Sequence, residues 1–140
     1  MSAIERRTIV VLAAVVERAD GRLLVTRRPR GTHLAGLWEF PGGKCEDGEA
    51  HEDCLARELQ EELDVASEIG AEVLVTEHDY DDRIVRLHFR HCRIAGEPTP
   101  MLGQEIRWVE RRELKDLEFP PADRELIDLL SQSGDHTAEG

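Results

Sequence analysis

The chain has 140 residues, the usual length of one domain, and its 40% hydrophobic and 34% charged residues describe an ordinary soluble globule. Its formal net charge of −12 argues against a duplex or long-strand nucleic acid as partner, because proteins that bind such polymers neutralise phosphates with clustered Lys and Arg. The three cysteines are an odd number without metal-type spacing, so they predict neither a disulfide framework nor a zinc site, and they fit a reducing cytoplasm.

Strands are predicted where β-branched or alternating apolar residues gather between turn residues. The segments are 8–16, 23–26, 38–40, 73–76, 85–90 and 105–109. The first segment is apolar but too short to span a bilayer and lacks an export signal, so a buried strand is expected there rather than a membrane anchor. The turn at residues 19–22 predicts that the first two strands form a hairpin, and the alternation over 85–90 predicts a half-exposed strand.

Two helices are predicted from apolar residues at helical spacing. The first covers residues 50–63, and the second covers residues 122–130 after a pair of prolines. Residues 131–140 are small and polar, so a disordered tail is expected beyond a single domain at residues 1–130. The order of strands and helices predicts an α/β fold built around a sheet.

An acidic stretch raises the question of function. Residues 46–64 contain nine carboxylates and a single cation, Arg57. On a helix, Glu58, Glu61 and Glu62 crowd one stripe opposite the leucines, and each like-charge pair costs roughly 0.2–0.5 kcal/mol. A divalent cation would supply the missing counter-charge, and oxygen-only ligands suit Mg²⁺ or Mn²⁺. The alternative is a solvated acidic face, in which Arg57 softens the repulsion.

The spacing of this stretch resembles the signature of the Nudix hydrolases. Five residues separate Gly43 from Glu49, and seven more precede RELQEELDV at residues 57–65. Every position matches except Asp64, which stands where the family has a helix-ending glycine and where Asp can adopt a left-handed conformation at some cost. Three flanking segments look like the MutT-type branch, which sanitises nucleoside triphosphates. They are TRR at 26–28, LWEFPGGK at 37–44 and FPPA at 119–122.

The resemblance implies an α/β/α sandwich with a mixed, curved sheet, and with the motif forming a loop, a helix and a loop at the edge of that sheet. It places Mg²⁺, or else Mn²⁺, on the expected catalytic residues Glu58, Glu61 and Glu62. The backbone carbonyl of Gly43 is expected to be a further ligand. Lys44 is expected beside the phosphates of the substrate.

The resemblance also assigns a reaction and a structural pair. Glu49 and Arg57 are expected to fix the loop onto the helix. A metal-activated water would attack a bridging diphosphate and release a nucleoside monophosphate and pyrophosphate, with Glu58 as the expected general base. Leu102 lies about where MutT-type proteins often carry a further acid. Glu105, three residues later, is therefore either a metal ligand or an exposed strand residue.

Substrate-binding residues are expected outside the motif. Arg28 matches the second arginine of the family's Thr-Arg-Arg strand end and is expected to hold a phosphate, and the alternative is a surface arginine near Glu39. Tyr80 and Arg83 occupy the segment that lines the nucleoside pocket in the MutT branch, where an aromatic face stacks on a base. Asp123 stands where the oxidised-guanine sanitiser has a base-reading asparagine. When ionised it only accepts hydrogen bonds, so it fits the cytosine amino group, unless burial keeps it protonated or it merely caps a helix.

The expected function is Mg²⁺-dependent pyrophosphohydrolysis of oxidised or modified nucleotides, such as 8-oxo-dGTP or (d)CTP. The protein is expected to be a cytoplasmic monomer or homodimer that binds neither a nucleic-acid polymer nor a membrane. The alternative is a non-catalytic Nudix-fold module that senses a nucleotide or binds a protein. The presence of three acids at a repulsive spacing argues against this alternative.

Cys54 is expected in the core, and Cys45 is expected as a loop thiol whose pKa the surrounding acids raise.

Overall fold

The computed structural model describes residues 6–31 and 35–136. Its strands are β1 (Arg7–Val16), β2 (Leu23–Arg27), β3 (Trp38–Glu39), β4 (Gly42–Lys44), β5 (Ala66–Asp79), β6 (Arg83–Ala95) and β7 (Glu105–Val109). Its helices are α1 (His51–Leu63) and α2 (Arg124–His136), with short 3-10 helices η1 (Arg111–Asp116) and η2 (Pro121–Asp123).

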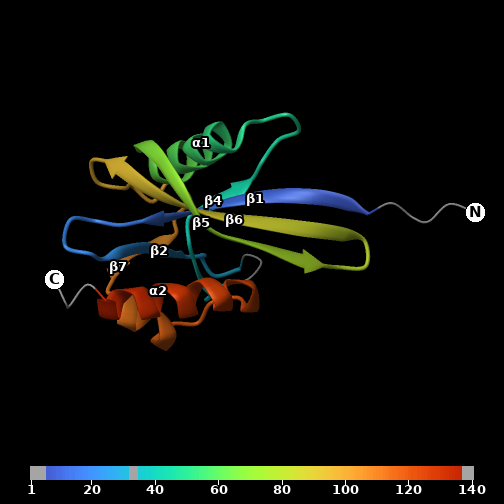
Figure 1. Cartoon of the computed structure of the whole chain (residues 1–140). Coiled ribbons are helices and arrows are strands. Elements are labelled where there is room, and N and C mark those ends of the chain that lie inside the picture. Colours follow the sequence, from blue (N-terminus) through green and yellow to red (C-terminus); the bar gives the residue numbers. More distant parts are fainter. Residues whose placement is uncertain (1–5, 32–34, 137–140) are drawn as a thin grey trace, which may run out of the picture.

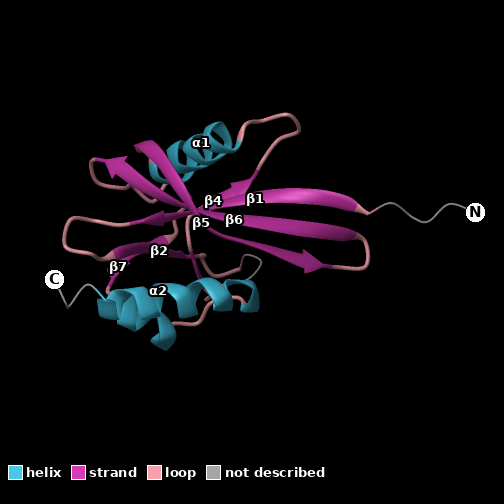
Figure 2. Ribbon diagram, in the orientation of Figure 1, coloured by secondary structure: helices cyan, strands magenta, loops and turns pink. Residues whose placement is uncertain are grey.

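The strands form two sheets that lie between α1 and α2 (Figures 1 and 2). One sheet has the order β4-β1-β6-β5, and the other has the order β3-β2-β7. Strands β1 and β6 run parallel while β1 and β4 run antiparallel, so the first sheet is mixed. This arrangement confirms the predicted α/β/α sandwich.

Strand β1 is central to the core because both of its faces are buried. Ala13 and Val15 belong to a hydrophobic cluster that includes Leu126 of α2. Leu12 and Ala14 point the other way and belong to a second cluster with the buried residues of α1. A strand covered on both faces has a continuous apolar sequence rather than an alternating one, which explains the composition of β1.

Helix α1 begins and ends where its sequence predicts. It ends at Asp64, whose φ of 55° and ψ of 47° lie in the left-handed region. The side chain of Gln60 donates a hydrogen bond to Oδ1 of Asp64 at 2.9 Å, which offsets part of the cost of a left-handed residue with a Cβ. Its core-facing residues are Cys54, Leu55, Leu59 and Leu63.

The predicted hairpin of the first two strands forms only at its turn. There Glu17 bridges Leu23 and the N–H of Arg18 donates to the carbonyl of Arg22 at 2.9 Å, while β1 and β2 themselves belong to different sheets. Both edges of β1 are occupied, by β4 on one side and by β6 on the other, so β2 pairs instead with β3 and β7.

Strands β5 and β6 are longer than predicted because their polar residues pair across the sheet. Arg86 lies opposite Glu77 and binds its carboxylate at 2.6 Å. The predicted half-exposed alternation of β6 fails at His88, which is buried because His51 of α1 lies over it, with ring centroids 4.6 Å apart.

Helix α2 is longer than predicted and continues to His136. Residues 131–136 are therefore helical rather than a disordered tail, and residues 137–140 lie outside the described residues.

The prediction that the cysteines form no disulfide is also wrong. Cys45, just after β4, is bonded to Cys54 of α1, with their Cα atoms 5.3 Å apart. Cys92 is a buried free thiol. The spacing of the cysteines did not predict the disulfide, because it does not reveal that α1 folds back over the C-terminal end of β4. Among the described residues, no helix is both long enough and apolar enough to cross a membrane.

Candidate active site

Strand β4 brings the backbone of Gly43 against the side chain of Glu58 on α1. β4 pairs with the middle of β1, which places Gly43 opposite Leu12. A Cβ atom added at Gly43 would lie 2.5 Å from the carboxyl carbon of Glu58, closer than real Cβ contacts allow. Glycine lets the carboxylate pack on the backbone here, and a larger residue would push the end of the Glu58 side chain aside.

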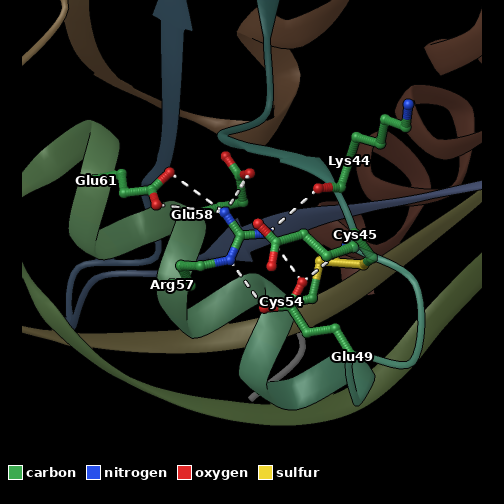
Figure 3. A network of polar contacts seen from close by, with 8 residues as sticks. Lys44, Cys45, Glu49, Cys54, Arg57, Glu58 and Glu61 are labelled. Carbon is green, nitrogen blue, oxygen red and sulfur yellow. Dashed lines mark hydrogen bonds and ion pairs between the residues drawn. A yellow bond between two sulfur atoms is a disulfide. The ribbon is translucent and has the colours of Figure 1, made fainter.

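Arg57 holds the motif loop, residues 45–50, on helix α1 (Figure 3). Its Nε and Nη2 donate to the two carboxylate oxygens of Glu49 at 2.8 and 2.9 Å. The backbone N–H of Glu46 donates to the same carboxylate at 2.9 Å. The hydrogen bond from Arg57 has the largest effect on the pKa of Glu49, and together with that from Glu46 it lowers this pKa to about 2. The ion pair of Glu49 and Arg57 is therefore charged at every physiological pH.

The guanidinium of Arg57 also contacts the acidic stripe. Its Nη1 lies 3.1 Å from Glu58 and 3.3 Å from Glu61, and its Nη2 donates to the backbone carbonyl of Lys44 at 3.3 Å. In Figure 3 the Lys44 side chain extends away from this network. Arg57 therefore orients two carboxylates of the stripe and the end of β4 at the same time.

Glu58 and Glu62 form a close carboxylate pair. Burial, then a hydrogen bond with Glu58 and its charge, raise the pKa of Glu62 to about 8. Because two neighbouring carboxylates cannot both be ionised cheaply, Glu62 keeps a proton that a divalent cation can replace. Glu61 is more open, with 57% of its side chain exposed. This set of carboxylate oxygens fits Mg²⁺ or Mn²⁺.

The loop before β7 caps the C-terminal end of α1, a feature that the sequence did not reveal. Gln104 is buried, and its Nε2 donates to the backbone carbonyl of Glu62 at 2.9 Å. The backbone N–H groups of Met101 and Thr99 donate to the carbonyls of Glu62 and Leu63 at 3.1 and 2.8 Å. Helix ends leave such carbonyls without partners, so this loop fixes the backbone that carries Glu62.

The ion pairs of Glu105 lie outside the acidic stripe of α1. It pairs with Arg27 on the neighbouring strand β2, directly across the sheet. Leu102, at the position where related proteins often have an acid, is 61% exposed. The geometry thus favours the exposed-strand interpretation of Glu105.

Glu39, which the sequence analysis named only as a neighbour of Arg28, also acts electrostatically on Asp123 and Glu62. Arg28 donates from Nε to Glu39 at 3.0 Å. The negative charge of Glu39 contributes to raising the pKa of both Glu62 and Asp123. Asp123 is 7% exposed, and burial is the main reason that its pKa rises to about 7. It is the last residue of η2, whose N-cap is Pro120, and it directly precedes α2.

Tyr80 and Arg83 lie together at the turn between β5 and β6. The guanidinium of Arg83 lies over the Tyr80 ring, 5.0 Å from its centroid, and Arg83 also pairs with Asp82 at 3.1 Å. The ring is 46% exposed. One face of Tyr80 is therefore covered by a cation.

Known proteins are similar to this chain in sequence and in fold. The chain matches the NUDIX domain family over residues 12–129. A CTP pyrophosphohydrolase from Escherichia coli is 36% identical over 125 residues, which cover 89% of this chain and 92% of that protein. An 8-oxo-dGTP diphosphatase from Haemophilus influenzae is 35% identical over 128 residues, which cover 90% of this chain and 93% of that protein. The solution structure of the E. coli ORF135 protein has a TM-score of 0.79 at 35% identity, with 88% of each chain covered. The chain therefore belongs to the Nudix family and is a Nudix hydrolase.

Proposed function

We propose that this hydrolase cleaves nucleoside triphosphates to a nucleoside monophosphate and pyrophosphate, with Mg²⁺ as its cofactor. The observation that carries the proposal is the carboxylate pair of Glu58 and Glu62, which lies against the backbone of Gly43 and beside Arg57. Proteins usually hold Mg²⁺ with one or two carboxylates and leave its other positions to water and substrate phosphates.

Each side chain has a distinct task in this proposal. Glu58, Glu61 and Glu62 hold the metal together with the carbonyl of Gly43. A divalent cation bound there neutralises phosphate charge and lowers the pKa of a water molecule. Glu58 accepts the proton of the attacking water, and its contact with Arg57 at 3.1 Å keeps the carboxylate in position.

The remaining substrate contacts lie outside the carboxylate pair. Lys44 is exposed and extends away from the Arg57 network, so its ammonium is available to the phosphates (Figure 3). Arg28 supplies a second cation, held by Glu39. Arg83 covers one face of Tyr80, and the opposite face of the ring stacks on the base.

The base is selected by Asp123 in this proposal. The related proteins named for CTP and for 8-oxo-dGTP are 36% and 35% identical to this chain, so identity alone does not separate these substrates. With a pKa of about 7, Asp123 is present in both protonation states near neutral pH. The protonated carboxyl donates a hydrogen bond to a carbonyl such as guanine O6, whereas the carboxylate accepts one from the cytosine amino group. We therefore expect preference for 8-oxo-dGTP at lower pH and for cytosine nucleotides at higher pH.

Free nucleotides are the proposed substrates, and the net charge of −12 disfavours a nucleic-acid polymer. We accordingly place the enzyme in the cytoplasm, where such nucleotides are dissolved, as a monomer or homodimer. Sanitisation of the nucleotide pool is the role that this substrate class supports.

The test is a turnover assay with Mg²⁺ on dCTP, 5-methyl-dCTP, CTP, 8-oxo-dGTP and dGTP, at about pH 6 and about pH 8, on either side of the Asp123 pKa. Glu58→Gln should lower turnover by roughly 10²- to 10⁴-fold, because residue 58 loses the negative charge with which it binds the metal and accepts a proton. Asp53→Asn removes an exposed carboxylate from the same helix and should leave turnover unchanged. Asp123→Asn should abolish the dependence of base preference on pH.

Two results would contradict the proposal. If no nucleotide is hydrolysed although Mg²⁺ binds, the chain is a nucleotide-sensing or protein-binding module of the same fold. If turnover occurs but base preference is the same at both pH values, Asp123 only precedes α2 and does not read the base.

A further inference from the structure

We propose that Cys45 and Cys54 are a redox modification site that controls how firmly the motif loop is held on α1. The inference rests on the proposed hydrolase function and adds regulation of that same site. In the oxidised state the loop is held in place and the metal ligands beside it are ordered. In the reduced state the loop is held only by the ion pair of Glu49 with Arg57 and by backbone hydrogen bonds such as that of Cys45 to Val10.

The disulfide joins the exit of β4 to the core side of α1. Cys45 follows Lys44 directly, and its backbone N–H donates to the carbonyl of Val10 on β1 at 2.9 Å. Cys54 is fully buried among the apolar residues of α1, and Cys45 is partly buried against the same cluster. The bond therefore closes a ring over residues 45–54 that contains the whole motif loop.

The same loop is held a second time by the ion pair of Glu49 with Arg57. Both carboxylate oxygens of Glu49 accept hydrogen bonds from Arg57, at 2.8 and 2.9 Å (Figure 3). Arg57 also donates hydrogen bonds to the carboxylate of Glu58 and to the backbone carbonyl of Lys44. Two attachments that restrain one segment are coupled, so the loss of one should make the other matter more.

The chemistry of such a site is reversible. A peroxide oxidises the thiolate of Cys45, the more accessible of the two, to a sulfenic acid and leaves as water or hydroxide. The Cys54 sulfur then attacks the Cys45 sulfur, the S–S bond forms and a second water leaves. A dithiol reverses the step by attacking the bond, delivering two electrons and two protons and leaving as its own disulfide. In the proposed cytoplasm, disulfides are usually transient and catalytic or redox-sensing.

A metal site is the competing interpretation of these residues. One ligand atom each from Cys45, Glu49 and Cys54 lies within 4.8 Å of the others. Two thiolates and a carboxylate would suit Zn²⁺ after reduction of the disulfide. However, both oxygens of Glu49 are engaged by Arg57, and one also accepts from the N–H of Glu46, so a metal would have to break the ion pair. The geometry therefore favours the redox site.

The test compares the full-length chain after treatment with peroxide and after treatment with a dithiol. Thiol alkylation followed by mass spectrometry should find one reactive thiol, that of Cys92 in the unfolded chain, after oxidation and three after reduction. Reduction should speed amide hydrogen exchange across residues 45–50 by roughly tenfold and raise the half-saturating concentration of Mg²⁺ in a binding titration. Glu49→Gln should lower turnover by roughly tenfold more in the reduced protein than in the oxidised protein.

Matched variants separate the site from general effects of redox treatment. Cys45→Ser should behave like the reduced protein under both treatments, while Cys92→Ala should keep the full response. Because chemical reduction of the unaltered chain leaves every residue in place, the result does not depend on a variant that folds poorly.

Two outcomes would overturn the proposal. The first is equal hydrogen exchange across residues 45–50 in both redox states. The second is uptake of one Zn²⁺ per reduced chain that Cys45→Ser abolishes. If exchange responds as expected while neither state hydrolyses a nucleotide, the redox site stands and the proposed enzymatic function fails.

Discussion

The substitution Asp123→Asn should change how the stability of the protein depends on pH. Asp123 is 7% exposed, and burial, followed by the charge of Glu39, raises its pKa from 3.8 to about 7. Because this pKa is higher in the folded protein than in the unfolded chain, the folded protein binds the proton more tightly. The resulting stabilisation is fully present below about pH 4 and is lost as the pH rises toward about 7.

The expected size of the effect follows from these two pKa values. A tenfold change in proton affinity corresponds to about 1.4 kcal/mol, so the burial of the ionised Asp123 carboxylate costs about 4 kcal/mol. Between about pH 5 and about pH 8, the unaltered protein should lose about 2–3 kcal/mol of its free energy of unfolding through this residue. Asparagine has a similar shape but does not ionise, so the variant should not show this loss.

The assay is urea denaturation of both proteins across this pH range in the presence of a metal chelator. Glu62 contributes equally to both curves, so their difference isolates Asp123. Asp128→Asn, an exposed substitution on α2, should reproduce the pH dependence of the unaltered protein. Parallel curves for the Asp123 variant and the unaltered protein would refute the reasoning, because they would mean that Asp123 is ionised without a burial penalty.

Three further predictions concern the carboxylate pair and the end of α1. Mg²⁺ binding at about pH 7 should release about one proton per chain, because the pKa of Glu62 without metal is about 8; calorimetry in buffers of different ionisation enthalpy measures it. Gly43→Ala should weaken Mg²⁺ binding by roughly tenfold or more, because its Cβ would displace the Glu58 carboxylate; a Mg²⁺ titration measures this. Asp64→Gly should raise the free energy of unfolding by up to about 1 kcal/mol, because glycine adopts φ of 55° without strain; thermal unfolding measures the change.

Each of these predictions has a result that would contradict it. Mg²⁺ binding without proton release would mean that Glu62 is already ionised. Unchanged Mg²⁺ affinity in Gly43→Ala would mean that Glu58 does not hold the metal. A loss of stability in Asp64→Gly would mean that the Gln60 hydrogen bond to Asp64 outweighs the backbone cost.

Local pattern was sufficient for α1, the helix that carries the acidic stripe. Apolar residues at helical spacing predict α1, and the motif spacing predicts that Gly43 and Glu49 meet Glu58 and Arg57. All four residues lie within a short stretch of chain, so a single turn and a helix bring them together without help from distant segments. The left-handed backbone conformation of Asp64 at the end of α1 likewise depends only on neighbouring residues.

Contacts between distant segments were decided only by the tertiary structure. The partners of β1 depended on which strands reach its two edges, and the predicted hairpin does not extend along β1 because β4 and β6 occupy them. The burial of His88, the capping of α1 by Gln104 and the effect of Glu39 on Asp123 have the same origin. Burial and charge act through space, so they shift a pKa or satisfy a carbonyl only once the chain has folded.

The disulfide shows most directly where sequence and structure divide. The nine-residue separation of Cys45 and Cys54 is compatible with two free thiols, and the sequence was interpreted in that way. The bond exists because β4 is anchored to β1 while the first turns of α1 pack on the other side of the same cluster. Sequence alone therefore determined the family, the course of α1 and the crowding of its acids. The tertiary structure decided which cysteines meet, which strands pair and which buried acids keep their protons, because each of these depends on distances between segments far apart in the chain.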